Sequence, residues 1–360
     1  MLRFRSIAPG ISAACAVGVL IASFSTVSAL AQGQTAKRPL TSTAERSISP
    51  AAKRPLTFLD AQELRQIGSL APSPDGRWLL YTLGSLDWKE GKRQTDIYLV
   101  SIDKGVGSTR QMTFTRDKND SDPRWAKDGS SFVFASDRDA PSSAATQNQL
   151  YAMRIDGGEA RKLTDAKEGV STFALSHDGK WLVYRSGKAG EEQLYRIPMD
   201  AADDATPEAL TKQPAGVGRW EWAPDDRRIY FVGPESADPD EKTRREKKFT
   251  VDIRNAETPL ASLWALDLDP VKVTQITRDP MMTVADFTVS PDGKWVGFRG
   301  ISADRYKRNI TEEGINGDPL LLEVSTGQIE RLVQNSQVAE SAPEFSPDSR
   351  IVAFSAPDAL

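Results

Sequence analysis

The chain has 360 residues, with 46 basic and 50 acidic side chains and a formal net charge of -4. This composition is ordinary for a soluble globular protein with a sizeable core, and it lacks the basic footprint that phosphate binding requires, so we expect no nucleic acid partner. One cysteine and one histidine exclude a disulfide framework and the usual zinc sites, and we predict neither a metal nor a cofactor.

The first 31 residues differ in kind from the rest of the chain. Two arginines precede an uncharged apolar stretch, and small residues stand at Ala29 and Ala31. These features predict a secretory signal peptide over residues 1–31, and hence an exported protein that is periplasmic or secreted. The alternative is a retained membrane anchor, which a glycine and several serines within the apolar stretch disfavour. After cleavage we expect no membrane contact and no thiol, because Cys15 lies in this segment.

Residues 32–54 are rich in alanine, serine, threonine, lysine and proline, and "AKRPLT" occurs at 36–41 and again at 52–57. Such a composition favours a disordered tether rather than a packed segment. We therefore place the folded domain at residues 55–360.

The folded domain contains six related turns. In the most complete copies serine, proline, aspartate and glycine precede a basic residue and tryptophan, as in Ser73–Trp78. Proline presets the first turn position, aspartate accepts local hydrogen bonds and glycine adopts the left-handed conformation, so each copy predicts a hairpin turn. The shared turn aspartates, which we expect to be structural, are Asp75, Asp128, Asp178, Asp225, Asp292 and Asp348.

Apolar runs recur in register with these turns. "RWLLYT" follows the first turn, and then come "DIYLVSIDKG" and the threonine-bearing "RQMTFT". Adjacent apolar positions in such runs indicate strands that are buried on both faces. A unit of about 50 residues is in the range of propeller repeats. We predict an all-β fold, a β-propeller with four-stranded antiparallel blades, about five of them plus the incomplete start of a sixth; a β-sandwich and a solenoid are the alternatives.

Sequence motifs for catalysis are sparse. His177 occupies the turn position where other copies have proline, and we interpret it as an exposed turn residue. A serine triad would need this histidine as its base, and the sequence contains no G-x-S-x-G motif. No glycine loop for phosphate follows a strand.

The interval between Asp225 and Asp292 is the longest, because it holds a charged insertion at residues 234–261. Nearly every residue from 238 to 248 is charged, and Arg244, Arg245 and Glu246 form the centre of the run. A solvated loop or short helix is the simpler interpretation. The functional alternative is a lobe on one face of the propeller, with these three residues as candidates for substrate gating.

The turns, the "IYLVSIDKG" type of strand and the insertion leading through "FTVDIRN" into "SLWALDLDP" together resemble the N-terminal propeller of the prolyl oligopeptidase family of serine peptidases. Its dipeptidyl peptidase and acylaminoacyl peptidase branches are the nearest, and the resemblance covers about residues 55–360. It implies an exported enzyme whose propeller limits the access of peptides to an α/β-hydrolase domain with a serine, histidine and aspartate triad. No triad residue can be transferred to this sequence, so we expect the catalytic domain to be absent and the chain alone to be inactive.

The dipeptidyl peptidase branch also binds the substrate amino terminus through two glutamates. The adjacent pairs Glu191-Glu192 and Glu312-Glu313 lack the aromatic-flanked helix of that motif, so the role is not transferred and surface loops are expected. Two functions remain open. One is part of a serine exopeptidase, with peptide substrates reached through the missing hydrolase domain. The other is a stand-alone propeller that binds a protein or peptide as a scaffold. An incomplete ring would also leave open strand edges, through which chains can associate.

Overall fold

The computed structural model divides the chain into two compact units. One comprises Met1–Ile7 and Glu63–Leu360, and the other is Ala8–Gln62, in which the helix α1 (Phe58–Gln62) is described. Within the described part of the chain, no helix is long and apolar enough to cross a membrane. The described residues are 2–6, 54–87, 91–141, 147–200, 205–234, 239–247, 260–302, 317–333 and 340–356.

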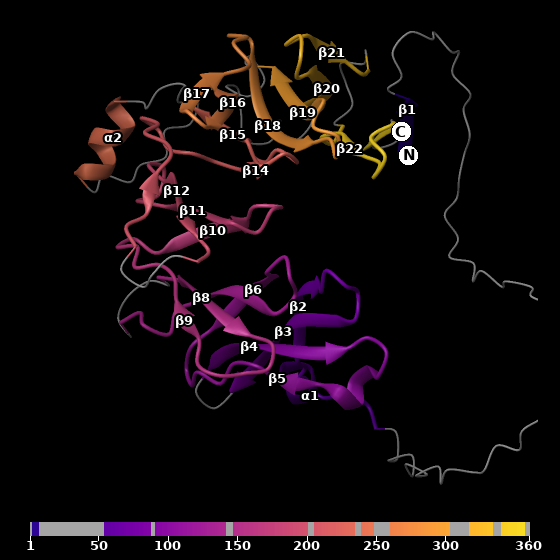
Figure 1. Cartoon of the computed structure of the whole chain (residues 1–360), viewed down its shortest axis with the longest axis vertical. Helices are drawn as coiled ribbons and strands as arrows, with labels where there is room; N and C mark the ends of the chain where they lie inside the picture. The colour runs from indigo at the N-terminus through magenta and orange to yellow at the C-terminus, as the bar shows by residue number, and fades with distance from the viewer. Residues whose placement is uncertain are drawn as a thin grey trace, which may run out of the picture. The chain divides into compact units, whose positions relative to one another are not determined.

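Antiparallel sheets that follow one another along the chain make up the larger unit (Figure 1). Five of them have four strands in chain order, and we call these blades 1 to 5. Their strands are β2 (Gln66–Pro72), β3 (Trp78–Asp87), β4 (Lys92–Ser101) and β5 (Arg110–Gln111) in blade 1; β6 (Asp120–Trp125), β7 (Ser131–Ser136), β8 (Gln149–Arg154) and β9 (Arg161–Lys162) in blade 2; β10 (Val170–Leu175), β11 (Trp181–Ser186), β12 (Gln193–Pro198) and β13 (Glu208–Ala209) in blade 3; β14 (Trp220–Trp222), β15 (Arg228–Pro234), β16 (Ala261–Leu268) and β17 (Val271–Gln275) in blade 4; and β18 (Met282–Val289), β19 (Trp295–Ser302), β20 (Gly317–Glu323) and β21 (Ile329–Arg331) in blade 5. The predicted propeller class with four-stranded blades is confirmed.

A sixth sheet has three strands, β22 (Glu344–Phe345), β23 (Ile351–Ser355) and β1 (Leu2–Ser6). The strands β22 and β23 flank the sixth turn, so the prediction of five blades and the start of a sixth is confirmed. The third strand comes from the other end of the chain, because Leu2 pairs with Ser355 and Ser6 with Ile351. The sequence pattern did not indicate this strand, since residues 2–6 lie inside the predicted signal peptide.

Each of the six repeated turns joins the first and second strands of its sheet. In the first turn the Ser73 hydroxyl donates to Asp75 Oδ1 at 2.6 Å, and the same oxygen accepts the backbone N–H of Arg77 at 3.0 Å. These bonds, together with the Arg77 guanidinium, lower the pKa of Asp75 to about 2. Asp178, Asp292 and Asp348 accept a serine hydroxyl and a backbone N–H in the same pattern. The turn is therefore held by contacts within a few residues of sequence.

In blades 1 to 4 a threonine just after the fourth strand bonds this end of the blade to the third strand. In blade 1 the Thr113 hydroxyl oxygen accepts the backbone N–H of Ile97 at 2.9 Å. The equivalent bonds have the same length in blades 2 to 4, where they run from Leu150 to Thr164, from Leu194 to Thr211 and from Leu263 to Thr277. A branched hydroxyl at this position both favours a strand and satisfies a buried donor.

Apolar side chains from successive blades form one core cluster at each junction. Separate clusters join blades 1 and 2, 2 and 3, 3 and 4, and 4 and 5. Several first strands also contact the first strand of the next sheet, as β14 contacts β18. The strand pattern with apolar residues on both faces therefore arises in blades 2 to 4 because each of them is packed between two others.

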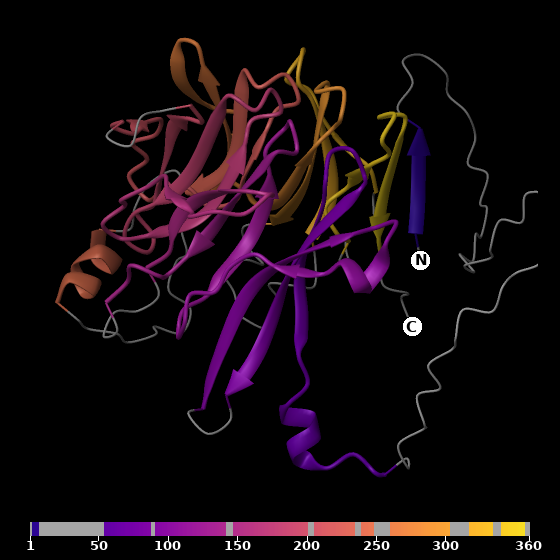
Figure 2. The same cartoon turned by 60° about the horizontal axis from the view of Figure 1, so that its bottom comes forward.

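Two elements extend beyond the compact blades. The strands β3 and β4 have 10 residues each and stay paired out to Asp87 and Lys92. Figure 2 shows this hairpin, in purple, reaching past the neighbouring strands. The helix α2 (Pro239–Glu246) connects β15 to β16 and lies at the margin of the larger unit in both views. The predicted charged insertion thus contains a short helix.

Candidate functional site

The gating candidates from the sequence all lie on α2. Arg244 is half-buried and Glu246 is exposed, whereas the side chain of Arg245 lies outside the described residues. None of the three lines either of the two cavities described below. Their gating role stays a prediction.

One of the two glutamate pairs lies within the described residues. Glu191 and Glu192 lie in the loop between β11 and β12, where the Glu192 carboxylate accepts the backbone N–H of Gly190 at 2.8 Å. Glu312 and Glu313 lie outside the described residues.

The first strands of blades 2, 3 and 4 surround a cavity of about 590 Å³, which we call the first-strand cavity. Arginines and aromatic side chains dominate its wall. The lining residues are Arg124 from β6; Thr172, Phe173, Ala174 and Leu175 from β10; His177 and Arg185; and Gly218, Arg219, Trp220, Glu221 and Trp222 around β14. No motif in the sequence marks this group, because it is assembled from three blades about 50 residues apart.

Three hydrogen bonds hold the Arg185 side chain at the wall of this cavity. Its Nε donates to the Ser171 hydroxyl oxygen at 2.9 Å, and its Nη1 donates to the carbonyl oxygens of Val217 at 3.1 Å and Gly218 at 2.7 Å. These bonds join blade 3 to the segment that enters blade 4. All three acceptors are neutral, so none of them offsets the positive charge of the guanidinium at the cavity wall.

Aromatic rings are fixed on the same wall. The indole N–H of Trp220 donates to the Thr172 hydroxyl oxygen at 2.9 Å, which ties β14 to β10. The Arg124 guanidinium lies 4.9 Å from the centroid of the Phe173 ring, a cation–π geometry. The Phe173 ring is buried, whereas the Trp220 ring is partly exposed and offers the cavity a flat apolar surface near the Arg185 guanidinium.

The carboxylate of Glu221 also lies on the wall of this cavity. Glu221 on β14 lies 3.7 Å from the Arg219 guanidinium and accepts the backbone N–H of Val289 at 3.4 Å. Burial raises the pKa of Glu221 above its ordinary value, although these contacts act in the opposite direction. Arg219 in turn pairs with Asp286 of β18 at 2.8 Å. These contacts link the first strands of blades 4 and 5.

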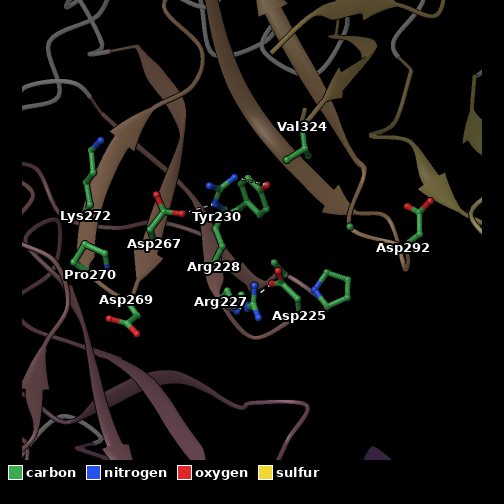
Figure 3. Close-up of a pocket in the computed structure, with 13 residues that line it drawn as sticks. Asp225, Arg227, Arg228, Tyr230, Asp267, Asp269, Pro270, Lys272, Asp292 and Val324 are labelled. Carbon is green, nitrogen blue, oxygen red and sulfur yellow. Dashed lines mark hydrogen bonds and ion pairs between the residues drawn. The ribbon is translucent and has the colours of Figure 1, made fainter. Parts of the chain in front are cut away.

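A second cavity, of about 610 Å³, lies between blade 4 and the turn of blade 5. Figure 3 shows the Arg228 side chain between Asp267 and Tyr230 in this cavity. Arg228 Nε donates to Asp267 Oδ1 at 2.7 Å, and these two residues are direct cross-strand partners in β15 and β16. Because its best-placed charges already pair across the sheet, this cavity carries a weaker case for ligand binding.

His177 lies on the exposed side of the third turn, as expected from its position in the repeat. Its Nδ1 is 2.7 Å from Asp226 Oδ1, and the other oxygen of Asp226 accepts the backbone N–H of Asp178 at 2.7 Å. Asp226 has a φ of 56°, in the position where other turns have glycine. Its side chain therefore fastens the turn of blade 4 to the turn of blade 3, and the Asp225-Asp226 pair in the fourth copy was the available sequence signal.

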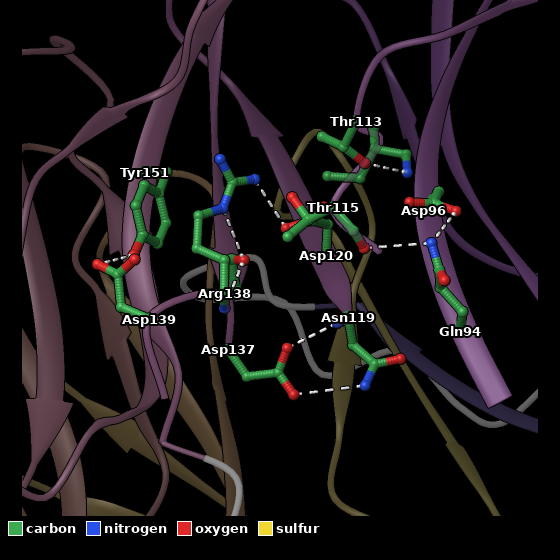
Figure 4. A network of polar contacts seen from close by, with 12 residues as sticks. Gln94, Asp96, Thr113, Thr115, Asn119, Asp120, Asp137, Arg138, Asp139 and Tyr151 are labelled. Atoms are coloured by element: carbon green, nitrogen blue, oxygen red, sulfur yellow. Dashed lines mark hydrogen bonds and ion pairs between the residues drawn. The ribbon is translucent and has the colours of Figure 1, made fainter. Parts of the chain in front are cut away.

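A buried polar network joins blades 1 and 2 (Figure 4). Asp120 is fully buried, and its Oδ1 accepts Arg138 Nη2 at 2.9 Å. Asp96, which is 6% exposed, accepts the Gln94 side-chain amide at 3.1 Å through Oδ2, whereas its Oδ1 has no hydrogen bond among the described residues. Nor do the described residues include three or more histidine, cysteine, aspartate or glutamate side chains placed to hold a metal ion. The network links blade 1 to the segment that enters blade 2, because the backbone N–H of Thr95 donates to Asn119 Oδ1 at 3.1 Å.

Replacing Asp96 by asparagine should stabilise the protein at pH 7 by about 1 kcal/mol, because a neutral amide costs less to bury than a carboxylate. Burial and the nearby charge of Asp120 raise the pKa of Asp96 in the folded state. The destabilisation by the ionised group is therefore largest above the folded pKa and disappears as the pH falls towards the unfolded value. Urea unfolding at pH 7 and pH 4 measures the free energy of unfolding of the variant. We expect this free energy to rise at pH 7 alone. Asp165→Asn, at a side chain that is 91% exposed, is the control, and an equal gain at both pH values would contradict the interpretation.

No family model matches the sequence. Dipeptidyl-peptidase 5 of Porphyromonas endodontalis is 22% identical over 299 residues, which cover 81% of this chain and 37% of that protein. The β-propeller domain of the trilobed protease from Pyrococcus furiosus has a TM-score of 0.52 at 10% identity, over 82% of this chain and 83% of that domain. A solved prolyl endopeptidase has a TM-score of 0.53 at 11% identity, over 79% of this chain and 37% of that protein.

The structural likeness establishes the propeller fold, and the sequence relatives supply the peptidase connection. The chain spans 37% of the length of the dipeptidyl-peptidase 5 that it matches. It is therefore a relative of the dipeptidyl-peptidase 5 proteins and resembles the N-terminal propeller region of the prolyl oligopeptidase family of serine peptidases.

Proposed function

We propose that the chain is the propeller portion of an exported serine exopeptidase and limits which peptides reach a hydrolase domain. The observation that carries this proposal is the match to dipeptidyl-peptidase 5 over 81% of the chain. The chain itself contains no G-x-S-x-G motif, so its part in the reaction would be the selection and passage of peptides rather than bond cleavage.

The first-strand cavity supports a role in peptide handling. The Arg185 guanidinium, which is a hydrogen-bond donor, and the flat Trp220 ring line this cavity of about 590 Å³, a size that suits an extended segment of a few residues. Peptides offer backbone carbonyl groups to such donors and side chains to flat rings. A folded protein could not enter a space of this size, so the cavity would discriminate by chain extension.

Short unstructured peptides should bind the 360-residue chain, and a folded domain that contains the same peptide sequence should not. Trp220 and Trp222 line the cavity, so quenching of tryptophan fluorescence during a peptide titration is a direct measurement. The variant Trp220→Phe keeps the ring surface but should reduce the signal. Trp78→Phe, in blade 1 and outside the cavity, is the matched control. Equal binding of the peptide and the folded domain would contradict the proposal.

A stand-alone scaffold is the second candidate function. The pairing of β1 with β23 favours it, because a strand from one end of the chain then completes a sheet at the other. In that case a folded partner should bind without any preference for extended peptides. The same titration therefore discriminates between the two functions.

The first residue of the mature protein tests whether the chain is exported. If residues 1–31 are a signal peptide, protein recovered from the cell envelope should begin at Gln32, because signal peptidase requires the small residues at Ala29 and Ala31. The mature protein would then lack β1. Amino-terminal sequencing that finds residues 2–6 retained would contradict export by cleavage. It would favour the three-stranded sheet in which β1 pairs with β23.

A further inference from the structure

The inference concerns the charge that the first-strand cavity can recognise, and it rests on the proposed peptide-binding function. Arg124, Arg185 and Arg219 line the cavity. Arg124 pairs with Asp122 at 3.0 Å, and Arg219 pairs with Asp286 at 2.8 Å. Arg185 is the only one of the three without a carboxylate partner among the described residues, where its hydrogen bonds go to one hydroxyl and two carbonyl oxygens.

The hydrogen bonds of Arg185 also define which edge of the guanidinium remains available. Nε and Nη1 are occupied by Ser171, Val217 and Gly218, and Nη2 makes no hydrogen bond to any described residue. Three bonds that hold the group from blade 3 and from the entry to blade 4 leave it little rotamer freedom to lose when a ligand binds. A preorganised cation with free donors is suited to a carboxylate, which forms strong charge-assisted hydrogen bonds with guanidinium.

The surroundings of Arg185 favour an anion over a cation. The acidic side chain on the cavity wall, Glu221, has its pKa raised by burial and is directed to Arg219 and Val289. Glu221 therefore does not neutralise Arg185. The partly exposed Trp220 ring provides a flat surface for the apolar part of a ligand.

We propose that the first-strand cavity binds peptides through a carboxylate and that Arg185 is the residue that anchors this carboxylate. The carboxylate is either an acidic side chain or the carboxyl terminus of the peptide. The cavity would then select acidic or carboxyl-terminal segments among the peptides that the propeller admits.

Isothermal titration calorimetry of the 360-residue chain with three acetylated tetrapeptides tests this proposal. One has a glutamate side chain and an amidated end, one has glutamine and a free carboxyl end, and one has glutamine and an amidated end. We expect at least one carboxylate peptide to bind about tenfold more tightly than the neutral peptide, because a charge-assisted hydrogen bond is replaced by a neutral one. The two carboxylate peptides distinguish the side chain from the terminus as the source.

Arg185→Gln should remove this preference and weaken the preferred carboxylate peptide about tenfold, with a smaller loss for the neutral peptide, which offers Arg185 only neutral acceptors. Arg350→Gln, at a side chain that is 82% exposed in the last turn, is the control and should change nothing. Equal affinity of all three peptides for the unmodified chain would overturn the inference even if Arg185→Gln failed to fold. If no peptide binds at all, the proposed peptide-binding function fails as well, so the two failures are distinguishable.

Discussion

Replacing Arg138 by methionine should lower the free energy of unfolding by about 3–5 kcal/mol, because it leaves a buried carboxylate without its partner. Asp120 is fully buried at the start of β6, and the Arg138 side chain that pairs with it is 19% exposed. The Arg138 guanidinium also lies 4.5 Å from the centroid of the Tyr151 ring. In Figure 4 Arg138 lies between Asp120 and Tyr151, so one side chain serves both contacts.

Urea unfolding of Arg138→Met measures this loss. The matched control is Arg154→Met, whose side chain pairs with Asp156 but is 67% exposed, and which should change stability by less than about 0.5 kcal/mol. The double variant Asp120→Asn with Arg138→Met should recover part of the loss, because the buried charge is then removed as well. If the double variant is as unstable as the single one, lost packing rather than the uncompensated charge is the cause.

Replacing Phe231 by alanine should cost about 3–5 kcal/mol, because the cavity that it leaves lies between two blades that cannot close over it. The Phe231 ring on β15 is fully buried and parallel to the Trp264 ring of β16, with 6.1 Å between the centroids. It belongs to the cluster that joins blade 4 to Val183 and Leu194 of blade 3. The loss should therefore weaken the junction between blades and not blade 4 alone.

Thermal unfolding followed by circular dichroism measures the effect of Phe231→Ala. Phe114→Ala removes the same ring from a site that is 71% exposed and should leave the transition nearly unchanged. If the midpoint temperature of unfolding falls by a similar amount in both variants, the junction between blades 3 and 4 does not limit stability.

The sequence predicted the elements whose structure depends on nearby residues. In the turn at Ser73 the serine, the aspartate and the following backbone N–H groups bond within five residues, so their spacing alone indicates the turn. The threonine that follows the fourth strand also recurs in the sequence at a regular place in the repeat, although its hydrogen-bond partner lies on the preceding strand. The buried runs predicted strands because blades 2 to 4 each contact another blade on both faces.

The first-strand cavity could not be predicted, because its residues come from separate blades. Arg185 is one of many arginines in the sequence, and its partners Val217 and Gly218 lie more than 30 residues away. The same is true of β1, whose pairing with β23 joins opposite ends of the chain. The gating candidates on α2 were chosen for their charge, yet they line neither cavity.

The sequence by itself determined the repeat, the turn chemistry and the propeller class, because these depend on local hydrogen bonds and on the periodic burial of neighbouring residues. Tertiary structure alone decided which charges pair and which remain available. Arg219 pairs with Asp286 of the next blade, whereas Arg185 bonds to carbonyl oxygens at the entry to the next blade. The physical reason is that a side chain's electrostatic environment depends on neighbours in space, and packing blade against blade brings together residues that are far apart in the sequence.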